Sequence, residues 1–244
     1  MEAITKVNEN YGQDAPTVVR NLAVIGVALV VVDLALGIAG IAALQALRPT
    51  MRFTGWALIA MAVWMMVSSR WLKFVVLRRL LDARRWRGDE KVLDIGCGRG
   101  LVAVAAARRV PNGHVTGIDL WQEQDLAGNS PDAARVNAEA AGVAGRLAIE
   151  TGDARSLPYA DASFDVVASM TAIHNIPDAA GRARAIAEAW RVTRPGGQIL
   201  VYDIRHARAY AAQLREMGAS PVRMSGPILL WGVLGWRFSA IRPA

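Results

Sequence analysis

Three carboxylates stand where an α/β sheet commonly holds the polar groups of a small ligand. Asp94 lies in the stretch VLDIGCGRG, Asp119 ends the stretch HVTGID 25 residues later, and Asp153 follows the next apolar stretch. A carboxylate at the end of the second strand of such a sheet can accept hydrogen bonds from ribose hydroxyls. A carboxylate after the third strand can accept one from an exocyclic amine. Each signal is weak alone, but the ordered set predicts a nucleoside-like ligand.

A glycine-rich turn follows the first carboxylate. Gly96, Gly98 and Gly100 occupy alternate positions, so the backbone can turn tightly and a ligand can contact the main chain at the start of a helix. This spacing is not the G-x-G-x-x-G of dinucleotide enzymes, which makes a dehydrogenase the less favoured alternative.

Cys97 is the chain's single cysteine, which excludes a disulfide scaffold and a multi-thiolate metal site. We expect its side chain only to fill the loop.

The elements that must position these residues alternate along the chain from Lys91 onward. Short apolar stretches alternate with alanine-rich ones, a pattern typical of an α/β domain with a parallel sheet. The expected strands are residues 91–95, 114–119, 146–150, 164–169 and 198–203, with further candidates at 221–225 and 236–242. The expected helices are residues 99–109, 131–141, 179–192 and 207–217. The three carboxylates then share the carboxyl edge of the sheet, where ligands bind in such folds.

The ordered motifs identify a family. Together with the stretches FDVV at 164–167 and RPGG at 194–197, they resemble the class I S-adenosylmethionine-dependent methyltransferases. The nearest branch is the one that includes the ubiquinone/menaquinone-biosynthesis methyltransferases. The resemblance covers about residues 88–204 by motif and the tail by topology, and it leaves residues 1–87 uncovered. It implies a doubly wound, Rossmann-like, seven-stranded sheet over residues 88–244, S-adenosylmethionine as methyl donor, and no metal.

The resemblance also implies how the cofactor is held. The loop Gly96–Gly100 would approach the amino-acid part, and Asp94 would orient this loop or bind the methionine ammonium through water. Asp119 would hold the ribose hydroxyls. The adenine and the methionine side would be lined by residues at the ends of the second, third and fourth strands, namely Leu120, Trp121, Asp153, Ala154, Ser169 and Met170. The polar stretch 121–130 is expected to lie over the adenine or ribose, or else to be a solvated loop.

Two groups are candidates for the chemistry. Methyl transfer is an in-line displacement that needs chiefly alignment, and a base is required only when the nucleophile must lose a proton. His174 follows the fourth strand and is the first candidate for a base or a substrate-orienting group; the alternative is a structural histidine. Residues 1–21 contain the polar stretch NENYGQDAP, expected to be a lid through which Tyr11 or Asp14 contacts substrate or cofactor, or else a frayed terminus.

The chain is unusually apolar, with 53% hydrophobic residues, because of two stretches before the α/β domain. Residues 22–47 contain one charge, Asp33, and would span about 39 Å as a helix, enough to cross a hydrocarbon core of about 30 Å. Residues 53–69 contain none, and both stretches are expected to be transmembrane helices. Asp33 then falls near the middle of its span, where it lines a polar pocket or an oligomer seam, or only helps the two helices pack.

The net charge of +7 comes almost entirely from residues 70–87, which hold seven basic residues and one acidic residue. A basic cluster directly after a membrane span indicates contact with anionic lipids of the cytoplasmic leaflet, rather than with nucleic acid. Apolar residues interleave with these charges, so we expect an amphipathic helix at the interface. The catalytic domain is then cytoplasmic, and so are residues 1–21.

We expect an integral protein of the cell membrane that methylates a lipophilic acceptor. A quinone precursor or isoprenoid phenol comes first, because a bilayer-dissolved acceptor need not cross bulk water. A phospholipid head-group amine and a small hydrophobic thiol or amine follow. The alternative from another class is a non-catalytic membrane scaffold that keeps a nucleotide-like pocket. A homo-oligomer formed through the membrane helices is a further expectation.

Overall fold

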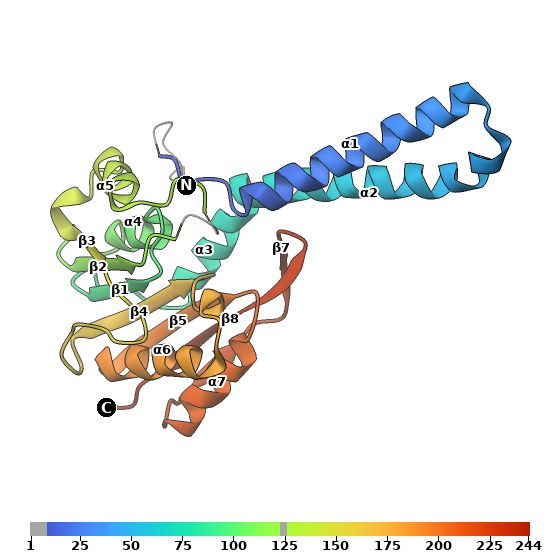
Figure 1. The fold of residues 1–244 in the computed structure, drawn as a ribbon. Coiled ribbons are helices and arrows are strands. Elements are labelled where there is room, and N and C mark those ends of the chain that lie inside the picture. The colour runs from blue at the N-terminus through green and yellow to red at the C-terminus, as the bar shows by residue number, and fades with distance from the viewer. Residues whose placement is uncertain (1–8, 123–125) are drawn as a thin grey trace.

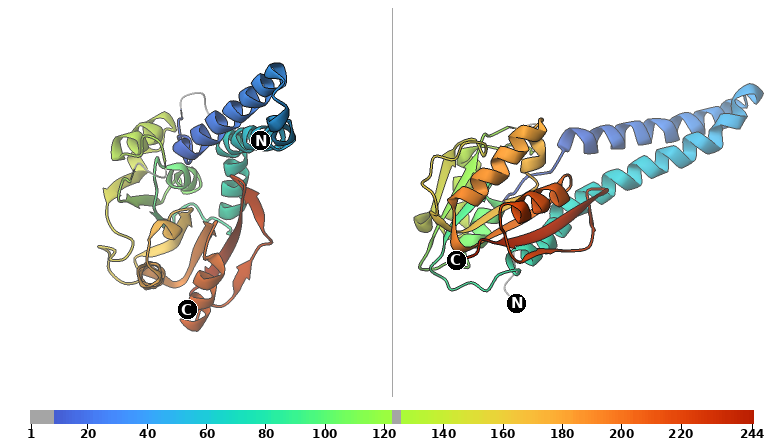
Figure 2. Two further views of the ribbon diagram at one scale, coloured as in Figure 1. Left: turned by 45° about the vertical axis from the view of Figure 1, so that its right-hand side comes forward. Right: turned by 90° about the horizontal axis from the view of Figure 1, so that it is seen from below.

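The computed structural model describes residues 9–122 and 126–244. It joins an α/β domain to a long helical hairpin that projects from one side (Figure 1, Figure 2). The expected segment 1–21 is therefore described only from residue 9. The strands are β1 (Lys91–Ile95), β2 (His114–Asp119), β3 (Leu147–Thr151), β4 (Phe164–Met170), β5 (Thr193–Asp203), β6 (Val222–Met224), β7 (Ile228–Leu230) and β8 (Val233–Ile241).

The strand order β3-β2-β1-β4-β5-β8-β6 confirms the expected doubly wound arrangement. The first five strands of this order are parallel, while β8 is antiparallel to both of its neighbours. The expected count of seven strands is one too few, because β7 pairs with the start of β8. Trp231 and Gly232 form the tight turn between them, with φ of 52° and 80°. The sequence predicted no strand between the candidates 221–225 and 236–242.

Helices cover both faces of the sheet. The helices after the first strand are α4 (Leu101–Ala107), α5 (Pro131–Ala140), α6 (Ala179–Val192) and α7 (Ala207–Glu216). α4 and α5 share one apolar core with one face of the sheet, and α6 and α7 share a second core with the other face. Alternating residues of β1 show this division, since Val92 faces the first core and Leu93 the second.

The hairpin consists of α1 (Pro16–Ala39), the 3₁₀ turn η1 (Ala42–Leu47) and α2 (Arg48–Val67), which continues through the π turn η2 (Ser68–Leu72) into α3 (Lys73–Leu81). The observed helices differ from the expected bounds 22–47 and 53–69 at all four ends. The first helix stops at Ala39 because Gly40 adopts the left-handed conformation, with φ of 64°. The second begins at Arg48, where Pro49 suits a first helical turn. The segments Pro16–Ala39 and Ala42–Leu81 are long and apolar enough to cross a membrane.

The expected surface helix over residues 70–87 is also corrected. The helix ends at Leu81, and its apolar side, formed by Val76, Leu77, Leu80 and Leu81, is buried in the first core of the α/β domain. Burying these side chains in the protein core removes their apolar surface from water, which is favourable. The α/β domain therefore includes α3 and begins structurally before residue 88.

Two small residues and an ion cluster hold the hairpin together. A Cβ on Gly26 would lie 2.8 Å from the Gly55 carbonyl oxygen, so only glycines permit this approach. Asp33 is buried and pairs with Arg48 (Nε–Oδ1 3.1 Å) and Arg52 (Nε–Oδ2 2.9 Å). These partners start α2, so Asp33 lies toward the far end of the hairpin rather than at its middle. The face that carries Gly26 and Asp33 is used within the hairpin itself.

Candidate functional site

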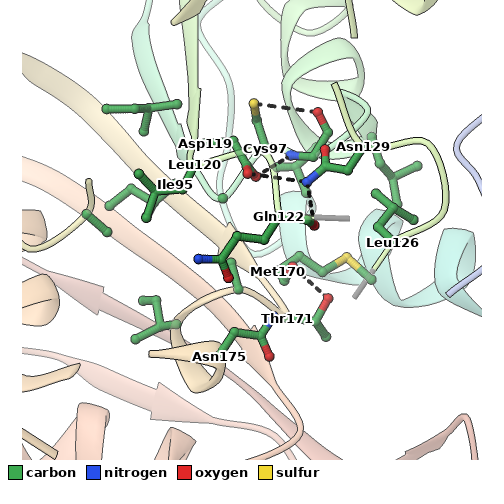
Figure 3. Close-up of a pocket in the computed structure, with 18 of the residues that line it drawn as sticks. Ile95, Cys97, Asp119, Leu120, Gln122, Leu126, Asn129, Met170, Thr171 and Asn175 are labelled. Carbon is green, nitrogen blue, oxygen red and sulfur yellow. Dashed lines mark hydrogen bonds between the residues drawn. The ribbon is translucent and has the colours of Figure 1, made fainter. Parts of the chain in front are cut away.

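A cavity of about 270 Å³ opens at the carboxyl edge of β1, β2 and β4 (Figure 3). The loops after these strands form one part of its wall, and the loop after β3 contributes Gly152 to Arg155. Figure 3 shows Asp119, Cys97 and Asn129 on one side and Met170, Thr171 and Asn175 on the other. The loop over residues 121–130 also contributes to the wall, as expected, through Gln122, Leu126 and Asn129; residues 123–125 lie outside the described part.

The glycine loop has the conformation that its sequence predicts. Gly96, Gly98 and Gly100 all have positive φ, at 71°, 52° and 83°. A Cβ on Gly96 would lie 2.1 Å from the Ala172 Cβ, and one on Gly98 would lie 2.9 Å from a methyl carbon of Leu126. Gly96 and Gly98 line the cavity, whereas Gly100 lies outside the wall and begins α4. The first two glycines thus keep the cavity edge free of side chains.

Asp119 ends β2 in the cavity wall, as expected. Its Oδ2 accepts a hydrogen bond from the Gly98 amide at 2.8 Å, which ties it to the glycine loop. Its Oδ1 accepts one from the Trp121 amide at 2.7 Å and one from Asn129 Nδ2 at 3.4 Å. A carboxylate can accept about four hydrogen bonds, so Asp119 keeps capacity for a ligand hydroxyl. Asn129 was missed by the sequence analysis because its partner lies 10 residues earlier in the chain.

Asp94 lies beneath the loop rather than in the cavity wall. It is 1% exposed, and neither of its carboxylate oxygens has a hydrogen-bond partner. Burial raises the pKa of Asp94 to about 8, against the opposing effect of the nearby Ala103 amide, and the Asp119 carboxylate adds to the rise. At neutral pH the buried carboxyl group is therefore largely protonated, and a cationic group brought near it would favour its ionised form. The expected role of orienting the loop or binding an ammonium indirectly fits this position.

Asp153 and Ala154 lie in the wall, as expected, but the Asp153 carboxylate is already paired. Arg155 Nε donates to both of its oxygens, at 3.0 and 2.8 Å, and the Arg155 amide donates at 2.8 Å. The Arg155 side chain lowers the pKa of Asp153, so the group is ionised at neutral pH. Arg155 was not among the expected residues, although a cation two residues after a functional carboxylate could have suggested it.

Cys97 lines the cavity and is buried. Burial, together with the carboxylates of Asp94 and Asp119, raises the pKa of its thiol well above the usual range. The thiol therefore stays protonated and contributes volume, as expected, rather than a nucleophile.

Besides Asp94 and Gly100, two more of the expected cofactor residues lie outside the cavity wall. Trp121 turns away, with its indole N–H donating to Thr151 Oγ1 at 2.8 Å, while its neighbour Leu120 lines the cavity. Ser169 is buried and donates to the Ile95 carbonyl at 2.9 Å, which joins β4 to β1. Its neighbour Met170 lines the cavity. In β4 the alternation of strand residues sends Met170 to the cavity and Ser169 away from it, whereas Trp121 follows the end of β2 and has a positive φ of 61°.

His174 is not in the cavity wall, although the residues on either side of it, Ile173 and Asn175, are. Its Nδ1 lies 2.6 Å from Oδ1 of the fully buried Asp203, and its backbone N–H donates to Oδ2 of the same residue at 3.2 Å. Both contacts fix the turn η4 (Ile173–Asn175) on the end of β5. The structure thus favours the structural alternative over a general base.

Tyr11 lines the cavity with its ring, but its hydroxyl is used elsewhere. The hydroxyl donates to Glu9 Oε2 at 2.8 Å, and Glu9 in turn pairs with Arg108. Burial, and then the hydrogen bond to Glu9, raise the pKa of Tyr11 far above its ordinary value. The phenol is therefore neutral and serves as an apolar surface rather than as an acid or base.

The amino-terminal segment lies against the α/β domain. Asn137 binds Asn10 from both sides, accepting from its amide at 2.8 Å and donating to its carbonyl at 2.9 Å. Arg99 Nε also donates to the Asn10 carbonyl at 2.8 Å. Lys73 and Asp14 enter the cavity wall in this region, as does Trp231 from the far end of the chain. Asp14 was expected from the sequence. Lys73 and Trp231, which lie 59 and 217 residues further along the chain, were not.

Nothing in the described residues suggests a metal. Within residues 9–122 and 126–244, no group of three or more histidine, cysteine, aspartate or glutamate side chains could hold a metal ion.

The central part of the chain matches a known family. Residues 93–201 match the family described as "Methyltransferase domain". The 27-O-demethylrifamycin SV methyltransferase of Amycolatopsis mediterranei is 37% identical over 150 residues, which cover 59% of this chain and 52% of that protein. The ubiquinone/menaquinone biosynthesis C-methyltransferase of Roseobacter denitrificans is 37% identical over 124 residues, covering 51% and 46%. The chain thus spans about half the length of these relatives.

Solved structures share the fold. The YcgJ protein of Bacillus subtilis superposes with a TM-score of 0.57 at 17% identity, covering 70% of this chain and 99% of that one. The geranyl diphosphate C-methyltransferase of Streptomyces coelicolor, solved with S-adenosyl-L-homocysteine, gives 0.57 at 14% identity, covering 71% and 80%. At these identities the likeness concerns the fold alone.

Proposed function

We propose that the chain is a membrane-anchored, S-adenosylmethionine-dependent methyltransferase that acts on a lipophilic acceptor, a proposal supported by the match of residues 93–201 to a methyltransferase domain and by the similar methyltransferases. The observation that carries the proposal is the meeting of the open glycine loop and the Asp119 carboxylate in one cavity. The rest of the chain supplies the anchor and closes the cavity.

The residues present fit S-adenosylmethionine. Gly96 and Gly98 leave a cradle that a Cβ would fill, and the unpartnered Asp94 carboxyl group beneath them suits a nearby cation. Asp119 would hold the ribose hydroxyls, and Leu120 and Ala154 would contact the adenine. Asp153 would contact the adenine amine only if it shares its oxygens with Arg155.

When bound, S-adenosylmethionine supplies a methyl group on a sulfonium, a leaving group that is already activated. The residues of the cavity then have to align the acceptor and exclude water. Tyr11 and the segment around it cover the cavity on one side, and Met170 and Ile173 line another. In this proposal the cavity supplies proximity and a largely apolar surrounding, and no base is assigned to His174, which lies against Asp203, or to the Tyr11 hydroxyl, which donates to Glu9.

The hairpin serves as the anchor in this proposal. Large apolar side chains such as Val24, Ile25, Phe53 and Trp56 are exposed along it, which is unfavourable in water and favourable in lipid. The helical stretch from Arg52 to Arg70 spans about 27 Å, close to the thickness of a hydrocarbon core. The Asp33 ion cluster lies at the far end of this band, and the basic residues from Arg70 onward lie at its near end. By the positive-inside rule, the near end and the catalytic domain are cytoplasmic and face anionic lipids.

The anchor favours an acceptor dissolved in the bilayer, with a quinone precursor or isoprenoid phenol first. The similar ubiquinone/menaquinone biosynthesis C-methyltransferase of Roseobacter denitrificans supports this order. A phospholipid head-group amine ranks second among the proposed acceptors, and a small hydrophobic thiol or amine ranks third.

Incubation of the purified full-length chain with labelled S-adenosylmethionine and a total membrane-lipid extract tests the proposal. We expect label in a lipid-soluble product that mass spectrometry can identify, and none with the variant Gly96→Ala. A chain that binds S-adenosylmethionine but labels no lipid would refute the lipophilic acceptor. A chain that does not bind it would refute the methyltransferase activity itself.

A further inference from the structure

Four residues of the cavity wall come from outside the matched segment 93–201. They are Tyr11, Asp14, Lys73 and Trp231, and they meet where the base of the helical hairpin joins the α/β domain. Two of them precede α1, one begins α3, and one forms the turn between β7 and β8. This part of the cavity is therefore built by the segments that distinguish the chain from a minimal methyltransferase domain.

A buried serine and a buried lysine fix these segments to one another. Ser69 Oγ accepts hydrogen bonds from the Asp14 amide at 3.3 Å, from Gln13 Nε2 at 3.2 Å and from Trp231 Nε1 at 3.0 Å. Lys73, 3% exposed, donates from Nζ to the carbonyl oxygens of Tyr11 at 3.3 Å and Gly12 at 3.1 Å. Three segments far apart in sequence are thus held in one geometry at the cavity.

Lys73 balances the charge of Asp14, and the Asp14 carboxylate can still accept a hydrogen bond from a ligand. Lys73 Nζ gives its third contact to Asp14 Oδ2, at 3.2 Å, so its three donors are all used. The Asp14 side chain is 23% exposed. Of the other two carboxylates of the wall, Asp119 accepts from the glycine loop and keeps its remaining capacity for the ribose, and Asp153 is paired with Arg155. Because Lys73 already neutralises Asp14, the pair favours a neutral hydrogen-bond donor over a cation.

The surroundings of this carboxylate are apolar and continue into the hairpin. The Tyr11 ring packs edge-on against Phe74, with 6.0 Å between centroids. Trp231 packs against a small core formed by Val19, Ala62 and Met65, at the base of the two long helices. Beyond it, Leu229, Val233 and Leu234 of the β7–β8 hairpin are exposed, which is unfavourable in water and suits contact with lipid.

We infer that these residues form the acceptor subsite and that the acceptor is a lipophilic alcohol or phenol. Its neutral hydroxyl donates to Asp14, and its apolar body lies against Tyr11 and Trp231, with its tail toward the base of the hairpin. The inference rests on the proposed function, since it names the acceptor class of the same cavity. Asp14 and Trp231 are then specificity-determining residues, and Lys73 and Ser69 are positioning residues.

Photolabelling of the full-length chain in lipid nanodiscs tests the subsite. The probe is a para-alkylphenol with a diazirine on its alkyl chain, and labelled peptides are mapped by mass spectrometry. We expect labels at residues 11–15, 69–74 and 228–234. Asp14→Asn and Trp231→Ala should each reduce labelling at least fivefold, and Trp231→Phe should retain it. The matched controls Asp132→Asn and Trp56→Ala, at exposed positions remote from the cavity, should not change it.

The affinity for S-adenosylmethionine, measured by calorimetry, separates the two hypotheses. It should stay within twofold in the Asp14 and Trp231 variants, which also shows that they fold. Labels confined to other parts of the chain, or labelling that is equal in these variants and their controls, would overturn the subsite while leaving the methyltransferase proposal intact. Stronger labelling by the matched alkylbenzylamine probe, which is cationic at neutral pH, would overturn the hydroxyl assignment.

Discussion

The buried Asp94 carboxyl group makes the free energy of unfolding depend on pH in a calculable way. Its pKa is about 8 in the folded chain and about 4 in the unfolded chain. Between these values the folded chain keeps a proton that the unfolded chain has released. The stability contributed by this group is thus complete below about pH 4 and is lost, by about 1.4 kcal/mol per pH unit, as the pH rises toward 8.

The variant Asp94→Asn isolates this effect because an amide does not titrate. Between pH 5 and pH 7 the wild-type chain should lose about 3 kcal/mol relative to the variant. For a chain of this length that corresponds to a relative fall in the melting temperature of about 6–12 °C. The assay is thermal unfolding in detergent at both pH values, with Asp132→Asn as an exposed control whose difference from wild type stays constant. A constant difference between wild type and Asp94→Asn would show that Asp94 is ionised in the fold, and would refute the reasoning.

Three further predictions concern the loop, the ribose carboxylate and the polar pair behind the cavity, and one concerns the hairpin. Gly96→Ala should weaken S-adenosylmethionine binding more than tenfold in calorimetry, because its Cβ would meet Ala172, whereas Gly142→Ala, also at positive φ but in open space, should not. Asp119→Asn should weaken the same binding roughly tenfold, the value of one charge-assisted hydrogen bond; unchanged affinity would remove its ribose role. His174→Gln should lower the melting temperature yet change kcat less than about threefold, and a large loss of kcat at constant stability would restore it as a base. Gly55→Leu should separate the two long helices and reduce the membrane-bound fraction on flotation. An unchanged membrane-bound fraction would count against the hairpin as the anchor.

The secondary structure of the α/β domain was predictable because its signals are local. The strands 91–95 and 114–119 and the helix 179–192 were placed to the residue, since apolar periodicity and helix-capping residues mark them directly. The glycine loop was equally evident, because positive φ at alternate positions requires glycine. Positions of the carboxylates at the sheet edge followed from the strand ends alone.

Errors arose wherever an apolar face had more than one possible partner. The helix after the hairpin is amphipathic in sequence, which is compatible with a lipid surface or with a protein core, and the sheet supplied the core. No strand was expected between residues 225 and 236, because β7 exists only through its pairing with β8. His174 was placed correctly at the sheet edge, but its orientation depends on Asp203, 29 residues away.

The sequence by itself determined the cofactor-binding framework, the apolar hairpin and the basic cluster between them. These features depend on composition, on periodicity and on backbone conformations that particular residue types require. Only the tertiary structure decided which of the candidate side chains face the cavity. It turned Trp121, Ser169 and His174 away from the cavity, and it brought Asp14, Lys73 and Trp231 together in its wall. The physical reason is that hydrogen bonds such as those of Ser69 join residues up to 162 positions apart, and no local pattern records such a contact.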